Sequence, residues 1–361
     1  MRILFYSDAT SWSGAVRVFA AAARGLAARG HEVAVACVEG TDVERRLRMD
    51  SYELLPIAGE RGTIAPAWRL GRALRARFVE VVFVDGTREQ RIAALAANRA
   101  GRAAIVRRVP LEVPLEVGWS ERASLRLAHT LFLPTDVGRG RERVPAAAPM
   151  SPVAPIGVDI AVYDGVRPAP RAAFADAAAE KVIACVYHPE GRARVATALR
   201  VAALLAARHP ELRLVVIGPG SGDPELRMHA AALRIARVVS FLGERNDHLS
   251  VLRAADLGWV AAESDDAAYA MLDLAALGVP VLAERTEVGQ RYIADGITGL
   301  LFAPGDAPAT AAAIARLLAA ADERAAMGSA GHARVAREFG ESPLVDGFEQ
   351  AAALAADRTR W

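Results

Sequence analysis

The segment from Leu252 to Arg337 constrains the fold more than any other part of the chain. It contains the apolar run Leu257–Ala261, which is typical of a buried parallel strand. The acidic turn Glu263–Asp266 follows and predicts a helix start, and Gly278 stands where that helix would take its C-terminal cap. A second strand is predicted at Val279–Ala283. This order places a helix N-terminus at the carboxyl end of a parallel strand, where open α/β sheets bind ligands and exposed amides favour phosphate.

Apolar runs and helical patterns alternate along the whole chain, which predicts parallel sheets with helices on both faces. The strands predicted in the first half are Ile3–Tyr6, Glu32–Val38, Val79–Val84, Ala104–Arg107 and His129–Leu133, and the helices are Ala15–Arg29, Pro66–Arg77 and Glu89–Arg99. The strands predicted in the second half are Val182–Val186, Leu212–Ile217, Val238–Leu242, Leu257–Ala261, Val279–Ala283 and Gly299–Phe302. The helices predicted there are Ala193–Ala207, Pro224–Leu233, Asp247–Ala254, Ala267–Leu277, Pro308–Ala321 and Glu323–Glu338.

Proline-rich stretches separate the two halves. Pro145–Pro155 is interpreted as a connector, and Val162–Ala177 is predicted to be the interdomain linker. We therefore expect one domain over residues 1–165 and a second over residues 178–343. A chain of 361 residues is long enough to give each of them a substantial core.

Composition excludes several classes of protein. The chain is 53% hydrophobic and 24% charged, which is typical of a globular protein and not of a disordered one. The net charge of +2 gives no case for a nucleic-acid partner. No apolar run approaches the roughly 20 residues that span a bilayer, and Met1–Tyr6 has the pattern of a strand and not of a signal peptide. We expect a cytoplasmic protein, at most peripheral to the inner face of the membrane.

Two smaller features leave alternatives open. Residues 1–165 contain 23 arginines and 18 acidic residues, an excess that could face an anionic acceptor or membrane surface, or simply be solvated. Cys37 and Cys185 fall in apolar runs, which predicts buried structural thiols. No cluster of Cys and His has the spacing of a metal site.

Several motifs together resemble one protein family. These motifs are Met1–Tyr6, Ser13–Ala15, Gly25–Val33, Ile156–Asp159, Gly278–Val281 and Asp295–Phe302. They resemble the retaining, family-4-type glycosyltransferases of the GT-B fold. The family pattern has a Glu, seven residues, a second Glu, then Gly-Thr-Pro-Val and Asp-Gly-x-x-Gly.

The resemblance implies an α/β protein of two Rossmann-like, doubly wound domains that face each other across a cleft. The N-terminal domain would be the acceptor side and the C-terminal domain would bind the nucleotide-sugar donor. A last helix, at about 344–361, would cross back onto the first domain. The implied activity is transfer of a sugar from a nucleotide sugar to a saccharide, glycolipid or small-molecule acceptor, with retention of anomeric configuration and no obligatory metal.

The family's two acidic positions fall on Asp265 and Asp273. The resemblance implies that Asp273 binds the ribose hydroxyls and that Asp265 contacts the donor sugar at the reacting centre. Plainer interpretations are a helical Asp paired with an Arg for Asp273, and an N-terminal cap for Asp265. Asp266, Ala267 and Ala268 occupy the family's Gly-Phe-Gly, whose amides approach phosphate. An added acid would repel a diphosphate, and the missing glycines would hinder close approach.

The remaining donor-site candidates follow strand ends. His188 stands at the family's phosphate-binding Arg, and Arg192 or Arg194 stands near its Lys, although surface loop residues are an equally good interpretation of each. By the same resemblance, the nucleotide would be approached by Ser13 and Gly14 in the first half and by Gly218, Gly220, Leu242, Gly243 and Arg245 in the second. A single Gly at any of these turns is weak support by itself.

Acceptor-side candidates lie in the first half. Asp85 ends the predicted strand Val79–Val84, so it could orient an acceptor hydroxyl or act as a base, or be a turn residue in Asp-Gly. Arg107 and Arg108, at and after the end of the next predicted strand, could bind an anionic acceptor or be solvated.

Two functions of different classes remain open. The first is an active glycosyltransferase. The second is a non-catalytic, GT-B-like binding or partner protein whose donor site has decayed, because His188 and the two Asp residues all depart from the pattern in one pocket. A nucleotide-sugar epimerase is a more distant alternative, since Asp295–Gly299 fits transferases better.

Overall fold

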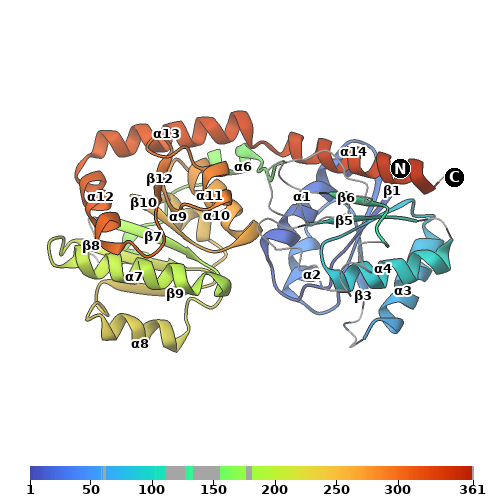
Figure 1. Ribbon diagram of the computed structural model, residues 1–361, viewed down its shortest axis with the longest axis horizontal. Helices are drawn as coiled ribbons and strands as arrows, with labels where there is room; N and C mark the ends of the chain where they lie inside the picture. The colour runs from blue at the N-terminus through green and yellow to red at the C-terminus, as the bar shows by residue number, and fades with distance from the viewer. Residues whose placement is uncertain are drawn as a thin grey trace. The chain divides into compact units, whose positions relative to one another are not determined.

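The computed structural model describes residues 1–57, 59, 62–101, 103–109, 127–132, 155–175 and 181–359. The chain divides into two compact α/β units, one of residues 1–157 with 341–361 and one of residues 158–340 (Figure 1). Each unit contains a six-stranded sheet. Most of the predicted connector Pro145–Pro155 lies outside the described residues.

The sheet of the first unit is parallel throughout and has the order β3-β2-β1-β4-β5-β6. Its strands are β1 (Arg2–Tyr6), β2 (Glu32–Val38), β3 (Glu53–Ile57), β4 (Val81–Val84), β5 (Ala104–Arg108) and β6 (Thr130–Phe132). The chain runs outward from β1 to β3 and then returns to the other side of β1 at β4. The order of strands therefore reverses between β1 and β4, which is where open α/β sheets bind ligands.

Helices cover both faces of this sheet (Figure 1). They are α1 (Gly14–Ala28), α2 (Asp42–Leu47), α3 (Ile64–Ala76), α4 (Thr87–Ala100) and α14 (Glu341–Thr359). α3 and α4 bury Leu70 and Ile92 against one face. On the other face, Phe348 of α14 is fully buried against Phe5 and Phe83, with ring centroids 5.7 and 5.0 Å away.

The sequence patterns did not predict α2 or β3. β3 contains Pro56, which argues against a strand in a sheet interior because proline lacks the amide donor. The structure places β3 at the edge of the sheet, paired only with β2 among the described strands. One side of an edge strand needs no ladder hydrogen bond, so Pro56 is tolerated there.

The sheet of the second unit is also parallel and has the order β12-β11-β10-β7-β8-β9. Its strands are β7 (Lys181–Tyr187), β8 (Leu212–Ile217), β9 (Val239–Gly243), β10 (Leu257–Ala261), β11 (Val281–Glu284) and β12 (Gly299–Phe302). The strand order reverses between β7 and β10. The loops that follow these two strands are therefore the expected ligand-binding edge.

Helices lie on both faces of this second sheet as well (Figure 1). They are α6 (Ile160–Asp164), α7 (Arg192–Ala206), α8 (Pro224–Ala232), α9 (His248–Arg253), α10 (Ser264–Ala276), α11 (Glu287–Tyr292), α12 (Ala307–Ala319) and α13 (Ala321–Glu338). The core beneath α7, α8 and α12 includes Trp259, whose ring lies 4.5 Å from that of Phe302. The short helices α6 and α11 were not predicted.

The prediction that Val162–Ala177 is an interdomain linker is wrong for the part of this segment that the structure describes, residues 162–175. Val158 forms a bridge with Gly340, and Ala169 donates its amide to Ser250 O at 2.8 Å. Arg171 forms an ion pair with Asp256 at 3.0 Å. Residues 158–175 are therefore built into the second unit, so the division falls after Gly157 and not after residue 165.

Two further observations concern the described residues. Both cysteines are buried and free, as the apolar runs predicted. Within the described ranges, no helix has the length and apolar character needed to cross a membrane.

Candidate functional site

The loop after β7 is held tightly against the end of β10 in the second unit. His188 donates its amide to Ala261 O at 3.1 Å, and Gly191 donates its amide to His188 O at 2.9 Å. A short 3-10 turn, Pro189–Gly191, lies between them. A Cβ atom at Gly191 would fall 1.9 Å from Ala261 O, so only glycine allows this approach. The backbone around His188 is fixed at the point where the strand order reverses.

The start of α10 lies at the same edge. Glu263 is its extended N-cap residue, and Ser264 has a φ of +56°. A left-handed conformation costs a residue with a side chain about 1–2 kcal/mol, and such strain is concentrated at functional sites. Asp265 and Asp266 follow in the first turn, where the helix dipole favours negative charge.

Three potential metal-ligating side chains meet there. His188 Nδ1 lies 3.5 Å from Asp266 Oδ1 and 3.8 Å from Glu190 Oε1. His188 and Asp266 are half-buried, and Glu190 is 42% exposed at its side chain. The sequence predicted His188 and Asp266 as site residues but missed Glu190, because its closeness to Asp266 depends on the turn at Pro189–Gly191. The His-x-Glu spacing was the available signal.

Both arginines predicted to bind phosphate are held in ion pairs. Arg194 is 13% exposed and lies 2.5 Å from Glu263 Oε1 and 3.0 Å from Glu284 Oε2. Arg192 pairs with Asp223 at 3.0 Å and with Glu225. The positive charges at the start of α7 are therefore already matched by acidic groups.

Asp273 accepts a hydrogen bond from a residue that the sequence analysis did not consider. Its side chain is buried in α10 at 4% exposure, and Tyr163 Oη donates to Asp273 Oδ1 at 2.5 Å. The partners considered for Asp273 from the sequence were ribose or an arginine, and the tyrosine of α6 was not considered. Tyr163 was missed because its segment was interpreted as a linker. Asp265, eight residues earlier on α10, is also buried, at 2% exposure.

The glycines of the second unit lie at strand ends, as predicted. Gly218 has a φ of +130°, and a Cβ there would fall 2.1 Å from Tyr187 O. Gly220 and Gly243 also have positive φ, and Leu242 belongs to β9. The guanidinium of Arg245 makes a bidentate interaction with the carboxylate of Asp247. Its Nε donates to Oδ1 and its Nη2 donates to Oδ2, each at 2.7 Å.

Ala267 and Ala268 do not offer the open backbone that glycines would give at these positions. Both are buried within α10, and the amide of Ala267 donates to Glu263 O at 3.0 Å. Their methyl groups contribute to the core of the unit. The amide of Ala267 is therefore used inside the helix and not directed at a ligand.

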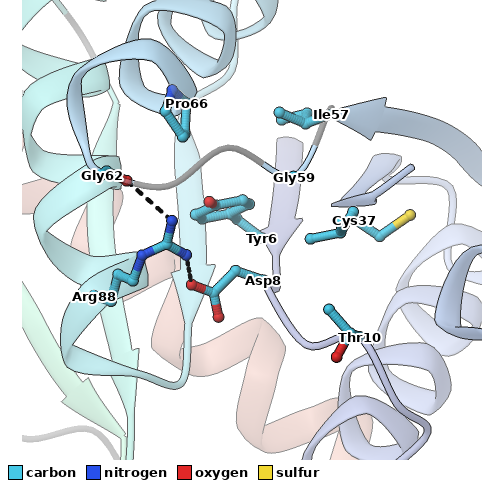
Figure 2. A pocket seen from close by; sticks show the side chains of 10 residues that line it. Tyr6, Asp8, Thr10, Cys37, Ile57, Gly59, Gly62, Pro66 and Arg88 are labelled. Carbon is cyan, nitrogen blue, oxygen red and sulfur yellow. Dashed lines mark hydrogen bonds and ion pairs between the residues drawn. The ribbon is translucent and has the colours of Figure 1, made fainter. Parts of the chain in front are cut away.

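The first unit has a cavity of about 400 Å³ at the carboxyl ends of β1, β2 and β3 (Figure 2). It is lined by Tyr6, Asp8, Thr10, Cys37, Val38, Ile57, Gly59, Gly62, Pro66 and Arg88. Arg88 forms an ion pair with Asp8 and donates to Gly62 O at 3.0 Å (Figure 2). The arginine thus links the loop after β1 to the segment before α3.

A buried carboxyl group lies beside this cavity. Burial of Glu89, together with its hydrogen bond to Asp8 and the charge of Asp8, raises its pKa to about 8. These surroundings thus favour the protonated form of Glu89. Asp8 and Glu89 were not predicted as site residues. They come from different βα units, and nothing in the local sequence pairs them.

The predicted acceptor residues lie at the ends of β4 and β5. Asp85 follows β4, as expected, and lies 3.3 Å from Arg108 Nη1. Arg107 donates to Gln90 Oε1 at 3.2 Å. Arg107 and Arg108 are the last residues of β5 and are 5% and 1% exposed, so the solvated interpretation of them is wrong. Ser13 is the N-cap of α1, accepting from Val16 N at 3.5 Å, and Gly14 is the first residue of that helix.

Comparison with known proteins decides the family. A model of the glycosyl transferases group 1 matches residues 167–334, and a model of glycosyltransferase family 4 matches residues 12–109. The chain belongs to the family-4 type of GT-B glycosyltransferases. The predicted fold class, an α/β protein with two Rossmann-like units, is confirmed.

Solved structures resemble this family-4 chain along nearly its whole length. A glycosyltransferase from Rickettsia africae ESF-5 has a TM-score of 0.80 at 15% identity, with 98% of both chains covered. Anabaena Alr3699/HepE, solved in complex with UDP and glucose, has a TM-score of 0.80 at 18% identity, with 98% of this chain and 99% of that chain covered. Identities this low show the fold alone.

Relatives of known function match shorter stretches. The lipopolysaccharide core biosynthesis glycosyltransferase LpsE of Rhizobium meliloti is 29% identical over 40% of this chain and 42% of its own length. A D-inositol 3-phosphate glycosyltransferase of Stackebrandtia nassauensis is 36% identical over 37% of this chain and 33% of its own length. The chain therefore spans less than half the length of these two relatives.

Proposed function

We propose that this protein transfers a sugar from a nucleotide-sugar donor to an acceptor hydroxyl, with retention of anomeric configuration. The observation behind the proposal is the position of α10. This helix begins where the strand order reverses, bears Asp265 and Asp273, and lies in the segment matched by the group 1 family model.

Each acidic residue has a role in the proposal. Asp273 binds the ribose hydroxyls, because a carboxylate can accept several hydrogen bonds and Tyr163 supplies one of them. Asp265 contacts the donor sugar. The bond from the anomeric carbon to the diphosphate breaks, a bond to the acceptor oxygen forms on the same face of the sugar, and the hydroxyl proton is released. No metal cofactor that stays bound to the enzyme is part of the proposal.

The acceptor is assigned to the first unit. Its cavity presents the Asp8–Arg88 pair and the aromatic ring of Tyr6, a lining suited to a molecule rich in hydroxyls. A saccharide, the head group of a glycolipid or a small hydroxylated molecule fits this chemistry. Asp85 orients the acceptor hydroxyl or accepts its proton, and the basic excess of residues 1–165 faces an anionic acceptor or membrane surface.

Nucleotide binding provides the first test. We expect one of UDP, GDP, ADP and dTDP to raise the melting temperature, since a ligand at 100 times its Kd stabilises the folded state by about 2.7 kcal/mol. Asp273→Ala should abolish that shift. Asp322→Ala, at an exposed residue of α13, is the control and should leave it unchanged. An unchanged affinity in Asp273→Ala would remove Asp273 from the site.

Turnover tests the reaction itself. The protein is incubated with the sugar nucleotide whose base gave the shift and with candidate acceptors. Proton NMR of the product at the earliest time point should show the donor's anomeric configuration. An inverted product would reject retention while leaving transfer intact.

One observation favours a second function, a binding protein with a decayed donor site. Arg192 and Arg194 are both engaged by acids, so neither is poised for a phosphate. This alternative predicts no melting shift with any of the four nucleotides at millimolar concentration, with or without divalent cation. It would direct the search to a partner protein.

A further inference from the structure

We propose that His188, Glu190 and Asp266 form a divalent-cation site, and that the cation held there binds the diphosphate of the donor. The proposal that an ion binds rests on the geometry of these three side chains alone. The diphosphate part rests on the proposed glycosyltransferase function.

The geometry of the three side chains suits a metal ion. Their ligand atoms all lie within 4.8 Å of one another, with His188 Nδ1 3.5 Å from one carboxylate and 3.8 Å from the other. Ligand atoms bound to one ion at about 2.0–2.2 Å lie roughly 2.8–3.6 Å apart when they are neighbours. Glu190 needs the larger movement, and it is also the most exposed of the three.

The backbone holds these ligands in place before an ion binds. The amide of His188 is bonded to Ala261 O, and Gly191 closes the turn against the same strand end. Asp266 is set by the first turn of α10, which starts two residues beyond Ala262. Two separate chain segments are thus joined by main-chain contacts at the site.

The charges around the site explain why a diphosphate would need a cation. Glu190 lies in the turn after β7, Glu263 is the N-cap residue of α10, and Asp265 and Asp266 follow in the first turn of that helix. Of the basic residues nearby, Arg194 is paired with Glu263 and Glu284, and Arg192 is paired with Asp223 and Glu225. A diphosphate approaching the turn after β7 and the start of α10 meets the carboxylates of Glu190 and Asp266, and a divalent ion that bridges it to them removes that repulsion.

The donor set narrows the choice of ion. One imidazole nitrogen with two carboxylates suits Mn²⁺ or Zn²⁺ better than Mg²⁺ or Ca²⁺, which favour all-oxygen sites. Three protein ligands also leave positions for phosphate oxygens. Mn²⁺ is therefore the probe of choice, because its free form is measured directly by electron paramagnetic resonance.

The first experiment measures Mn²⁺ binding to the full chain without nucleotide. We expect one ion per chain, and at least tenfold weaker binding in His188→Ala and in Asp266→Asn. Glu190→Gln changes an exposed residue and should fold, so it tests the site even if one of the other two variants does not fold. His209→Ala is the matched control, since His209 Nδ1 lies 3.3 Å from Glu211 Oε1 but has no third ligand grouped with it among the described residues.

Two results would overturn the site. One is no Mn²⁺ binding by the wild-type chain at millimolar ion. The other is wild-type affinity in folded His188→Ala, Asp266→Asn and Glu190→Gln alike. Both are independent of whether the protein transfers sugar.

The second experiment couples the ion to the diphosphate. Calorimetry compares the affinity for the nucleoside diphosphate that gave a melting shift in Mn²⁺ and in EDTA. We expect at least tenfold tighter binding in Mn²⁺, no such gain in His188→Ala, and none for the matching nucleoside without phosphates. Equal affinity in Mn²⁺ and EDTA would reject the diphosphate part. Failure of every nucleotide to bind in either condition would reject the proposed function instead, and the Mn²⁺ titration would still decide the ion site.

Discussion

Single residues at the two sheet edges show how partners distant in sequence define a site. Asp85 was predictable, because the carboxyl end of a parallel strand faces the ligand-binding edge whatever the rest of the fold. The contact between Asp8 and Glu89 was not, since it depends on β1 and β4 being neighbours. The bond from Tyr163 to Asp273 likewise required α6 to lie on α10. Residue types at strand ends could be read from sequence, whereas their partners could not.

Tyr163→Phe should lower the free energy of unfolding by about 1–3 kcal/mol, because the buried Asp273 loses a hydrogen-bond donor. Urea denaturation measures this. Tyr52→Phe is a matched control, since Tyr52 Oη donates to Asp50 at 2.7 Å and the carboxylate there is 19% exposed. Water can replace the lost donor at Asp50, so the control should cost less. An equal loss in the two variants would contradict a special role for burial at Asp273.

Glu89 should make stability depend on pH. Its pKa is raised from 4.5 to about 8 in the folded state, so the folded state binds the proton more tightly than the unfolded state. The resulting stability is fully present below about pH 4.5 and is lost as pH rises through about 8. Glu89→Gln keeps an uncharged group and should flatten the decline of the melting temperature between pH 5 and 8.

Glu53→Gln is the control for this pH series. Arg77 lowers the pKa of Glu53, so any stability from that pair is lost only at acidic pH. Between pH 5 and 8 the control should follow the wild-type curve. A Glu89→Gln curve parallel to the wild type would show that Glu89 is ionised throughout this range.

At the scale of elements, the most accurate predictions were those of strands formed by continuous apolar runs. The predicted bounds of β2, β8, β10 and β12 agree with the structure, because each run is buried and ends at a change of residue type. β3 was missed because Pro56 argues against a strand, and its position at the sheet edge was unknown. α11 was missed because its six residues are too few to show a helical period.

The contact between α10 and α13 depends on one glycine. A Cβ at Gly328 would fall 2.0 Å from Gly278 O, at the turn that ends α10. Gly328→Ala should therefore cost about 1–3 kcal/mol by forcing the helices apart. Gly331→Ala, one turn later, would only touch Ala275 at 3.5 Å and should gain up to about 1 kcal/mol from helix propensity. Thermal unfolding of the two variants checks the opposite signs, and equal shifts would contradict this contact.

At the scale of the whole molecule, the first unit is built from both ends of the chain. α14 packs on α1 and β5, although more than 180 residues separate it from the rest of the unit in sequence. The helix at about 344–361 and its place on the first domain were both predicted only from the family resemblance. Local periodicity predicts that a helix forms but not which sheet it covers.

Phe348→Ala should destabilise the first unit selectively. The ring is fully buried among Phe5, Phe19 and Phe83, so its removal should cost about 3–5 kcal/mol. Hydrogen exchange followed by mass spectrometry should show faster exchange in peptides from β1 and β4 and unchanged exchange in β7 and β10. Leu354→Ala, at an exposed residue of the same helix, is the control and should leave both sets unchanged. Uniform acceleration across both units would contradict this selectivity.

The position of α14 also orders events during synthesis. The ribosome must complete all of residues 158–340 before Phe348 emerges, which takes roughly ten to forty seconds at about 5–20 residues per second. The second unit is continuous in sequence and can fold before the first unit is complete. During that interval Phe5, Phe19 and Phe83 lack the ring that covers them, so the nascent chain presents an aromatic surface to chaperones and to other nascent chains.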